Sequence, residues 1–290
     1  MSGGRCALCG GASLRRARAG LEICPDCGLG AVYPLADPGE LRALYTRDYY
    51  EAWGPDGGED PAVREMKQAT FRARLRRLGP LPAGARVLDV GCATGHFLDL
   101  VAAAGGEPHG VEVSPYAAEV ASGRHPGRVR CGTLEEAGYP ADHFHAVFLS
   151  DVIEHVPQPA ALLAEVWRIV APGGRVVVAT PDLGSAGARL LGRRWFHRKG
   201  EHIVYFSRRS LRWALGHAGF GGIRLRRGSK TVTLAYLASH FRTYPLFPVT
   251  PVLRLLDRCL PCRLLRRRFR LPTGEIVAHA HKPHSGAIPG

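Results

Sequence analysis

The stretch RVLDVGCATGHFLDL, residues 86–100, constrains the fold of this chain more than any other part of it. An apolar run ends near Asp89, a loop containing Gly91 and Gly95 follows, and the stretch then takes on helical spacing. In open α/β sheets, ligands bind beyond the carboxyl ends of the strands, where glycine lets the backbone turn and approach them. The stretch therefore predicts a strand, a ligand-binding loop and a helix, in that order.

Strand-like and helix-like patterns alternate regularly after residue 85. The predicted strands are residues 86–90, 109–113, 128–132, 144–152 and 175–181. Most of them are near-continuous apolar runs, which is typical of strands buried on both faces of a sheet. Strands joined through helices form right-handed crossovers and a parallel sheet. The pattern predicts an α/β fold with a mostly parallel sheet.

An acid also stands at the end of the second predicted strand. Glu112 follows Gly91 by 21 positions, which suits a carboxylate that accepts the hydroxyls of a ribose. A dinucleotide is the first alternative, but its loop is usually G-x-G-x-x-G, whereas this loop is G-x-x-x-G. Asp89 is poorly placed for a phosphate and well placed for an ammonium group. S-adenosylmethionine (SAM) has that ammonium group and no phosphate, so it fits better.

Three segments resemble class I SAM-dependent methyltransferases. Residues 87–98 resemble their first motif, residues 110–121 their second-strand acid and the helix after it, and residues 148–181 their fourth and fifth strands. The resemblance covers roughly residues 85–228, with the last strand near 274–283. It implies a Rossmann-like, doubly wound, mostly parallel seven-stranded sheet and a SAM-dependent methyltransferase activity.

The resemblance also implies roles for single residues. Asp89 and the glycine loop would line the methionine end of SAM, and Glu112 would hold the ribose. Thr133, which stands where many members carry an acid, would lie beside the adenine with its neighbour Leu134. The full implied cofactor set is Asp89, Gly91, Cys92, Ala93, Gly95, Phe97, Glu112, Val113, Thr133, Leu134, Ser150 and Asp151.

Histidines are the candidate catalytic groups. An oxygen acceptor must lose its proton during methyl transfer, and histidine suits that task near neutral pH. His155, directly after the fourth strand, is the first candidate base and His202 is the second; ordinary packing is the alternative for both. Asp151, Glu154 and His155 also resemble the acid-x-x-Glu-His set of ubiquinone-type O-methyltransferases, which is associated with a divalent metal. Mg²⁺ at this set is a further alternative.

Four cysteines near the N-terminus form two C-x2-C pairs, spaced C-x2-C-x14-C-x2-C. Four thiolates within tetrahedral reach select Zn²⁺ and leave no open position for chemistry. The spacing predicts a structural zinc ion in a small zinc-ribbon module, bound by Cys6, Cys9, Cys24 and Cys27; a redox dithiol is the alternative. This part of the chain resembles the zinc-binding leader of many bacterial methyltransferases that modify sugars and other small metabolites.

We expect three segments. Residues 1–36 form the zinc-binding module, residues 37–84 a helical linker or lid, and residues 85–290 the methyltransferase domain, with a basic helical insertion at 231–272 before the last strand. The N-terminus lacks the apolar core of a signal peptide, and no uncharged apolar run reaches the roughly 18 residues of a membrane span. A cytoplasmic location is therefore expected.

The acceptor is less well determined than the cofactor. The leading hypothesis is O-methylation of a small molecule, namely a sugar, glycolipid or secondary metabolite. An RNA methyltransferase is the alternative, because the net charge of +14 suits phosphate contacts and some rRNA enzymes pair a four-cysteine module with this fold. A non-catalytic zinc-ribbon interaction protein is the second alternative. The intact motif residues argue against it.

A basic segment near the C-terminus bears on the same question. Residues 254–270 contain seven arginines and one acid, with leucines between them. Either the segment is scaffold with arginines in water, or it lies on anionic lipid at the inner membrane face and brings the enzyme to a lipid-linked acceptor. The sequence leaves the oligomeric state open.

Overall fold

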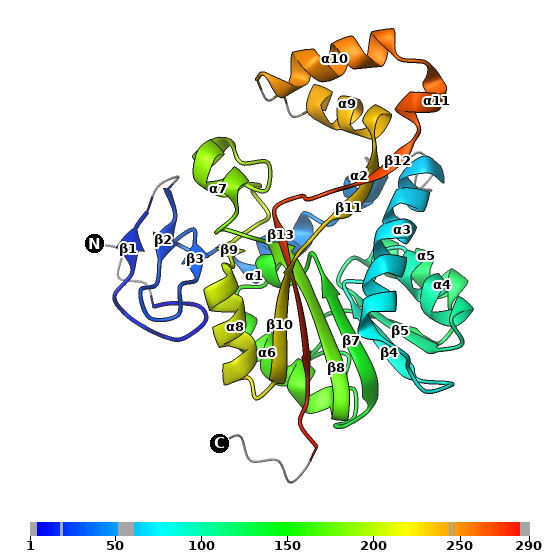
Figure 1. Cartoon of the computed structure of the whole chain (residues 1–290). Helices are drawn as coiled ribbons and strands as arrows, with labels where there is room; N and C mark the ends of the chain where they lie inside the picture. Colours follow the sequence, from blue (N-terminus) through cyan, green and yellow to red (C-terminus); the bar gives the residue numbers. More distant parts are fainter. Residues whose placement is uncertain (1–4, 18–19, 52–60, 244, 246, 285–290) are drawn as a thin grey trace.

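A seven-stranded sheet forms the centre of the molecule (Figure 1). The computed structural model describes residues 5–17, 20–51, 61–243, 245 and 247–284. The strand order is β10-β13-β8-β7-β4-β5-β6, and only β13 runs antiparallel to its neighbours. The predicted fold is confirmed. The strands are β4 (Arg86–Val90), β5 (Glu107–Glu112), β6 (Val129–Cys131), β7 (Phe144–Ser150), β8 (Val170–Pro181), β10 (Gly221–Arg227) and β13 (Glu275–His281).

Helices bury both faces of this sheet, as the near-continuous apolar strands require. Neighbouring residues of one strand belong to different apolar clusters: Val87 packs with Phe97 of α4, whereas Leu88 packs in the cluster that contains Leu163 of α6. This alternation follows from the two-residue period of a strand. The helices around the sheet are α3 (Pro61–Leu78), α4 (His96–Ala103), α5 (Pro115–Arg124), α6 (Pro159–Ile169) and α8 (Arg208–His217).

Two short helices near the carboxyl ends of the strands precede α3. Helix α1 (Pro38–Ala43) begins at Asp37, whose carboxylate accepts the N–H groups of Gly39 and Glu40. Such a cap satisfies donors that the helix itself leaves unpaired. Helix α2 (Arg47–Glu51) follows directly. Residues of α1, α2 and α3 line the cavity at the end of the sheet where ligands bind in this fold class.

The N-terminal module is joined to the main domain through a shared sheet. Its strands are β1 (Arg15–Arg16), β2 (Glu22–Ile23) and β3 (Gly30–Ala31), and the fourth strand, β9 (Val204–Tyr205), comes from the methyltransferase region. Gly30 pairs with Tyr205 and Ala31 with Val204. Arg209 of α8 donates to the carbonyl oxygens of Pro25 and Asp26 at 3.0 and 2.8 Å. The module is thus built into the main fold.

The basic insertion forms a lobe on a two-stranded ribbon (Figure 1). Strands β11 (Lys230–Thr233) and β12 (Arg268–Leu271) pair antiparallel at its base, which the sequence analysis did not predict. Between them lie α9 (Leu234–Thr243), α10 (Val249–Cys259) and α11 (Cys262–Leu265). A further short helix, α7 (Ala186–Leu191), follows β8. Within the described parts of the chain, no helix has the length and apolar character to cross a bilayer.

Candidate active site

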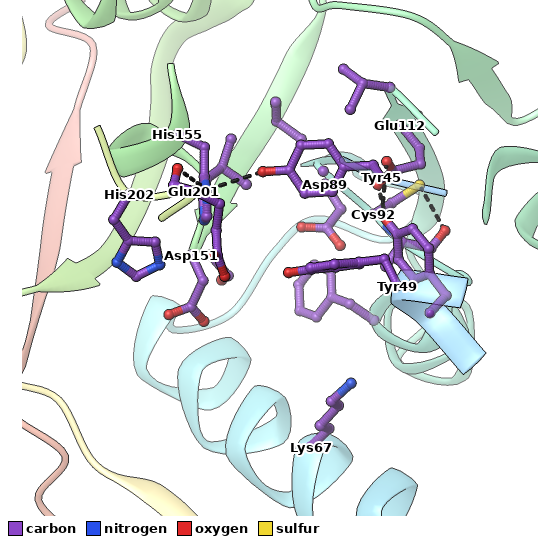
Figure 2. Close-up of a pocket in the computed structure, with 18 of the residues that line it drawn as sticks. Tyr45, Tyr49, Lys67, Asp89, Cys92, Glu112, Asp151, His155, Glu201 and His202 are labelled. Atoms are coloured by element: carbon purple, nitrogen blue, oxygen red, sulfur yellow. Dashed lines mark hydrogen bonds between the residues drawn. The ribbon is translucent and has the colours of Figure 1, made fainter. Parts of the chain in front are cut away.

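A cavity of about 840 Å³ lies at the carboxyl ends of β4, β5 and β7, bounded by α1–α3 and the insertion. That volume is at the upper end of the range for small-molecule sites, roughly 300–1,000 Å³. Every predicted cofactor residue except Gly95 lines the cavity, and so do His155 and His202. Figure 2 shows His155, His202 and Asp151 on one side of it and Glu112 and Cys92 on the other.

The loop after β4 has the backbone geometry that its glycines allow. Gly91 has φ +70°, and a Cβ there would lie 2.6 Å from Cγ2 of Val152, so two separate constraints require glycine. Ala93 also adopts a left-handed conformation, with φ +47°, although it has a side chain. Gly95, with φ +85°, starts α4 and contributes to the turn rather than to the cavity wall.

Glu112 holds this loop in place. One carboxylate oxygen accepts the N–H of Ala93 at 2.8 Å, which stabilises the strained turn. The other oxygen accepts the N–H of Ser114 at 2.9 Å and the hydroxyl of Tyr50 at 3.2 Å. Burial raises the pKa of Glu112, and these donors oppose that effect. Tyr50, from α2, thus makes the kind of contact that a ribose hydroxyl would make.

A second acid, Asp89, is buried at the end of β4. Burial, and then the neighbouring charge of Glu112, raise the pKa of Asp89, while Arg74 opposes them. A cationic ligand group beside Asp89 would favour its charged form. The two acids and the glycine loop together suit a ligand that carries both an ammonium group and neighbouring hydroxyls.

The loop after β6 carries an acid that sequence reasoning missed. The Thr133 N–H donates to Oε2 of Glu136 at 2.8 Å, and the Glu136 N–H donates to Oγ1 of Thr133 at 3.2 Å. Arg42 of α1 forms an ion pair with Glu136 at 3.3 Å. The Glu136 carboxylate thus lies beside Thr133 in the wall of the cavity, which Leu134 also lines.

Asp151 lies in a cluster of charged residues of which Arg74 and Glu275 are buried, while Asp151 and Lys230 are partly exposed. Its backbone is left-handed, with φ +58°, and its carboxylate contacts Nζ of Lys230 at 3.3 and 3.4 Å. Arg74 lies 3.9 Å away, and Glu275 contacts Lys230 at 2.6 Å and Arg74 at 3.3 Å. Burial alone would raise the pKa of Asp151, but Lys230 and Arg74 hold it well below its usual value. These ion pairs join β7, β11, β13 and α3 beside the cavity.

The geometry of His155 fixes its tautomer. The residue ends a short 3-10 helix, Ile153–His155, and its Nδ1 lies 2.9 Å from the carbonyl oxygen of Glu201 and 3.0 Å from the hydroxyl of Tyr45 (Figure 2). A carbonyl oxygen can only accept, so Nδ1 carries a hydrogen. Burial lowers the pKa of His155, and the Glu201 carbonyl opposes that shift. At neutral pH the imidazole is therefore uncharged, with a lone pair on Nε2.

Comparison with known proteins gives the family. The model of a family described as "Methyltransferase domain" matches residues 63–225, more than half of the chain. The chain belongs to this family. The prediction of a class I methyltransferase domain, made from the motifs around Gly91 and Glu112, is confirmed.

Curated relatives of this methyltransferase domain are named ubiquinone biosynthesis O-methyltransferase. The protein of Aromatoleum aromaticum is 32% identical over 151 residues, which cover 50% of this chain and 63% of that protein. The one from Xanthomonas oryzae pv. oryzae is 30% identical over 168 residues, covering 51% and 67%. The chain spans less than two-thirds of the length of most of the curated relatives it matches, among them the Aromatoleum protein. A SAM-dependent methyltransferase from Archaeoglobus fulgidus shares the fold, with 20% identity, a TM-score of 0.53 and coverage of 81% of this chain and 98% of that chain.

Beside His155 lie two further buried groups, His202 and Glu154. The His202 ring is perpendicular to the His155 ring, with centroids 4.7 Å apart, and burial holds the pKa of His202 far below its usual value. Glu154 accepts the Thr180 hydroxyl at 3.0 Å through one oxygen. Its other oxygen and Nδ1 of His202 have no hydrogen-bond partner in the part of the chain that the structure describes.

The structure assembles a different set from the one predicted for Mg²⁺. Ligand atoms of Glu154, His155 and His202 lie within 4.8 Å of one another, whereas Asp151 is bound by Lys230 and Arg74. Mg²⁺ prefers oxygen ligands in octahedral geometry, and this set offers two imidazoles and one carboxylate. The set therefore suits Mg²⁺ poorly.

The unusual environment of Glu154 gives a stability prediction. Burial, and then the charge of Asp151, raise the pKa of Glu154 to about 8 from 4.5. Between these values the folded protein keeps a proton that the unfolded chain releases, so this residue lowers stability as pH rises through that window. Glu154→Gln should have an unchanged melting temperature near pH 4.5 and one raised by a few degrees at pH 8, measured by differential scanning fluorimetry.

The matched control for this experiment is Glu119→Gln on the exposed side of α5. It removes the same charge without burial and should show no such pH dependence. An equal shift for Glu154→Gln at both pH values would contradict the protonated state of Glu154.

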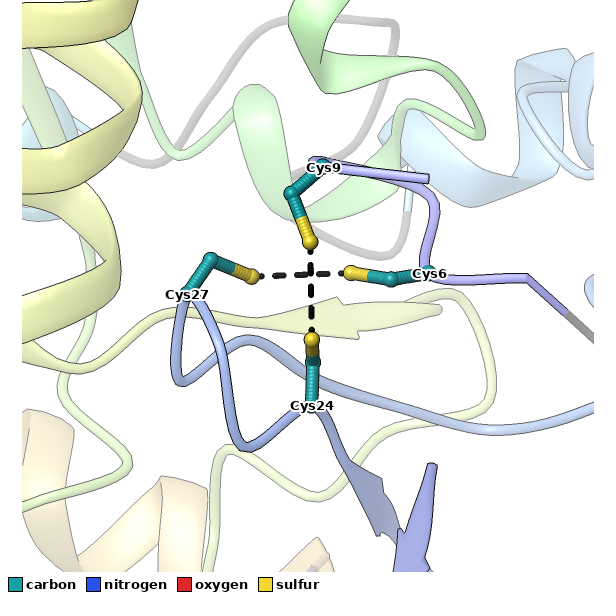
Figure 3. Close-up of side chains that lie close together, drawn as sticks. All are labelled: Cys6, Cys9, Cys24 and Cys27. Atoms are coloured by element: carbon teal, nitrogen blue, oxygen red, sulfur yellow. Dashed lines mark hydrogen bonds between the residues drawn. The ribbon is translucent and has the colours of Figure 1, made fainter. Parts of the chain in front are cut away.

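The four predicted zinc ligands converge on one point (Figure 3). The Sγ atoms of Cys6 and Cys27 lie 3.5 Å apart, as do those of Cys9 and Cys24, and all four lie within 4.8 Å of one another. Disulfides have sulfur atoms about 2.0 Å apart, whereas a tetrahedral ZnS₄ site with bonds of about 2.3 Å separates its sulfurs by about 3.8 Å. The arrangement fits a four-thiolate metal site.

Proposed function

We propose that the protein is a SAM-dependent methyltransferase that methylates an oxygen of a small-molecule acceptor. One observation carries the proposal: a single cavity has the acids and glycine loop of a SAM site at one end and a neutral, oriented His155 at the other. Membership of the methyltransferase-domain family and the names of the curated relatives support it.

The cofactor end would be built by the residues implied from the sequence. SAM supplies a methyl group activated on a sulfonium sulfur. Glu112 would accept the ribose hydroxyls in place of the Tyr50 hydroxyl, and Asp89 would face the ammonium group. The rest of the wall would come from Gly91, Cys92, Ala93, Phe97, Val113, Thr133, Leu134, Ser150 and Asp151, with Gly95 shaping the turn.

His155 would act as the general base at the acceptor end. Its Nδ1–H stays on the Glu201 carbonyl, which fixes the ring and leaves Nε2 free to take the proton of the acceptor hydroxyl. Tyr45 lies against the same ring and limits its rotation. His202 packs across the other side of His155 and closes the wall.

The lining of the acceptor end favours an organic molecule with an apolar body. Side chains from α3 and α9 supply apolar contacts, among them Met66, Leu237 and Phe241, and Lys67 supplies a cationic one. Burial and the nearby Lys230 lower the pKa of Lys67 to about 8. A sugar, glycolipid or secondary metabolite remains the proposed acceptor class, and a lipid-linked acceptor would use the apolar wall most fully.

The proposal assigns a role to each part of the chain. Residues 1–36 would be a structural module that holds one zinc ion through Cys6, Cys9, Cys24 and Cys27. Residues 37–84 would form the lid over the cavity, because Tyr45, Tyr50 and Lys67 reach it from there. Residues 85–290 would form the methyltransferase domain, with the insertion at 231–272 over the acceptor end.

Glu112→Ala tests the cofactor site. The variant loses two charge-assisted hydrogen bonds to the ribose, each worth roughly 1.5–3 kcal/mol, so the affinity for SAM should fall by at least a hundredfold. Titration calorimetry with SAM measures it directly. Tyr50→Phe, which removes only the competing hydroxyl, should bind SAM at least as tightly as the wild type. Unchanged SAM affinity in Glu112→Ala would refute the site, and binding of NAD in place of SAM would refute the proposed function.

A further inference from the structure

The lobe formed by α9, α10 and α11 presents apolar side chains to solvent. Val252 and Leu255 are 54% and 62% exposed, and Leu264 and Phe247 are 45% and 87% exposed. Seven large apolar side chains are exposed among the described residues, and these four all lie in this one lobe. We call Phe247, Val252, Leu255 and Leu264 the α10 face. Such a concentration marks an interaction surface rather than scattered surface residues.

The α10 face is not needed to hold the lobe together. Thr250 and Leu253 are buried on the inner side of α10, which packs against α9. Val252, Leu255 and Cys259 follow helical spacing on the outer side, and all three are exposed. The helix therefore has two apolar sides. One side packs against the protein, and the other side faces solvent.

Arginines surround the α10 face. Residues 254–270 carry seven arginines and one acid, Asp257, which forms an ion pair with Arg242 at 3.7 Å. Six of these arginines are exposed and form no salt bridge to any acid within the described ranges: Arg254, Arg258, Arg263, Arg266, Arg267 and Arg270. The partner must therefore offer negative charge beside an apolar phase.

An anionic lipid bilayer has both properties. Basic residues favour its headgroups, and apolar side chains of an interfacial helix enter the boundary of the acyl chains. RNA would use the arginines, but single-stranded RNA stacks its bases on aromatic side chains, and three members of the α10 face are aliphatic. The combination of aliphatic and cationic groups favours lipid.

The same lobe borders the cavity. Tyr236, Leu237, His240 and Phe241 of α9 line the acceptor end, while α10 packs on the other side of α9. Figure 1 shows the lobe held away from the main sheet on the β11–β12 ribbon. The α10 face thus lies one helix away from the acceptor end.

We propose that the α10 face docks the protein peripherally on anionic membranes and places the acceptor end of the cavity beside the lipid. The docking stands on the surface alone, and only the placement of an acceptor rests on the proposed function.

Vesicle sedimentation of the purified full chain tests the docking without SAM or acceptor. The probes are vesicles of pure phosphatidylcholine and vesicles with about one-third phosphatidylglycerol, each at low and high salt. The protein should sediment with the anionic vesicles and not with the neutral ones, and high salt should weaken the binding. Because no methyl transfer is read, a failure here is distinguishable from a failure of the proposed function.

Two double variants and two matched controls locate the surface. Arg266→Gln with Arg267→Gln should weaken binding to anionic vesicles about thirtyfold, since each basic residue near the surface contributes about 1 kcal/mol. Val252→Ser with Leu255→Ser should weaken it about tenfold or more. The controls are Arg15→Gln with Arg16→Gln on β1 and Leu190→Ser on α7, all exposed, and neither should change binding. Unchanged SAM affinity in every variant confirms that the chain still folds.

Three results would overturn the proposal. They are no binding to anionic vesicles even at low salt, equal binding to neutral vesicles, and equal losses in the control variants. A fourth result would also overturn it: the protein binds total RNA, depends on the same arginines for this binding, and does not bind vesicles. RNA would then be the partner of this surface.

Discussion

Cys24→Ser is expected to abolish zinc binding and to destabilise far more than the N-terminal module. Structural zinc bound by four thiolates contributes roughly 10–16 kcal/mol of folding free energy in zinc-finger peptides at neutral pH. Cys24 and Cys27 are fully buried in the apolar cluster that also holds Phe206 and Leu211 of the main domain. Loss of the metal should therefore lower the melting temperature by more than about 10 °C and send much of the protein into the insoluble fraction.

Elemental analysis and thermal unfolding measure this outcome. The wild type should carry about one zinc per chain and the variant almost none. Cys259→Ser is the matched control, because it makes the same change at an exposed cysteine outside the cluster, and it should keep the zinc and the melting temperature. Fresh, reduced wild-type protein without zinc would rule out the metal site.

His155→Ala should slow turnover by about a hundredfold or more while SAM affinity stays the same, because a general base contributes that much. The acceptor for this assay comes from incubating tritiated SAM with lipid, polysaccharide and RNA fractions. The wild-type rate should fall only below pH 6.5, since the pKa of His155 is lowered, and the variant should lose that acid limb. His217→Ala, at an exposed histidine of α8, is the control.

Full activity in His155→Ala would leave His202 or positioning alone as the source of the rate. Chelator sensitivity that an added divalent ion reverses would instead favour a metal at Glu154, His155 and His202. Calorimetry with SAM separates either outcome from a damaged cofactor site.

The central sheet was predictable because its signals are local. The apolar run before Gly91 predicts β4, and Glu112 marks the end of β5. Each signal lies within a few residues of the strand end that it predicts. The ribbon β11–β12 has no such signal: its strands are four residues long and pair across an intervening helical segment, with basic and polar residues along both. β9 is shorter still, and its pairing with β3 depends only on how the module docks.

The candidate site, like the sheet, was predictable where its residues belong to a local sequence motif. Residues on the loops after β4, β5 and β7 follow from the motif, whereas Tyr45 and Tyr50 reach the cavity from short helices remote in sequence. Sequence spacing placed Asp151, Glu154 and His155 together. In the folded chain Lys230 binds the first of these, and His202 takes its place beside the other two. Long-range ion pairs of this kind leave no periodic trace in a sequence.

During synthesis, the four cysteines emerge from the ribosome long before the strand that completes their sheet. β9 follows β3 by roughly 170 residues, which corresponds to on the order of ten seconds or more of translation. Through that interval the open edge of β3 has no partner from the main domain. Because β3 is only two residues long, that edge offers little template for pairing with other chains. Metal capture by Cys6, Cys9, Cys24 and Cys27 would then hold the two C-x2-C loops of the nascent chain together before β9 is made.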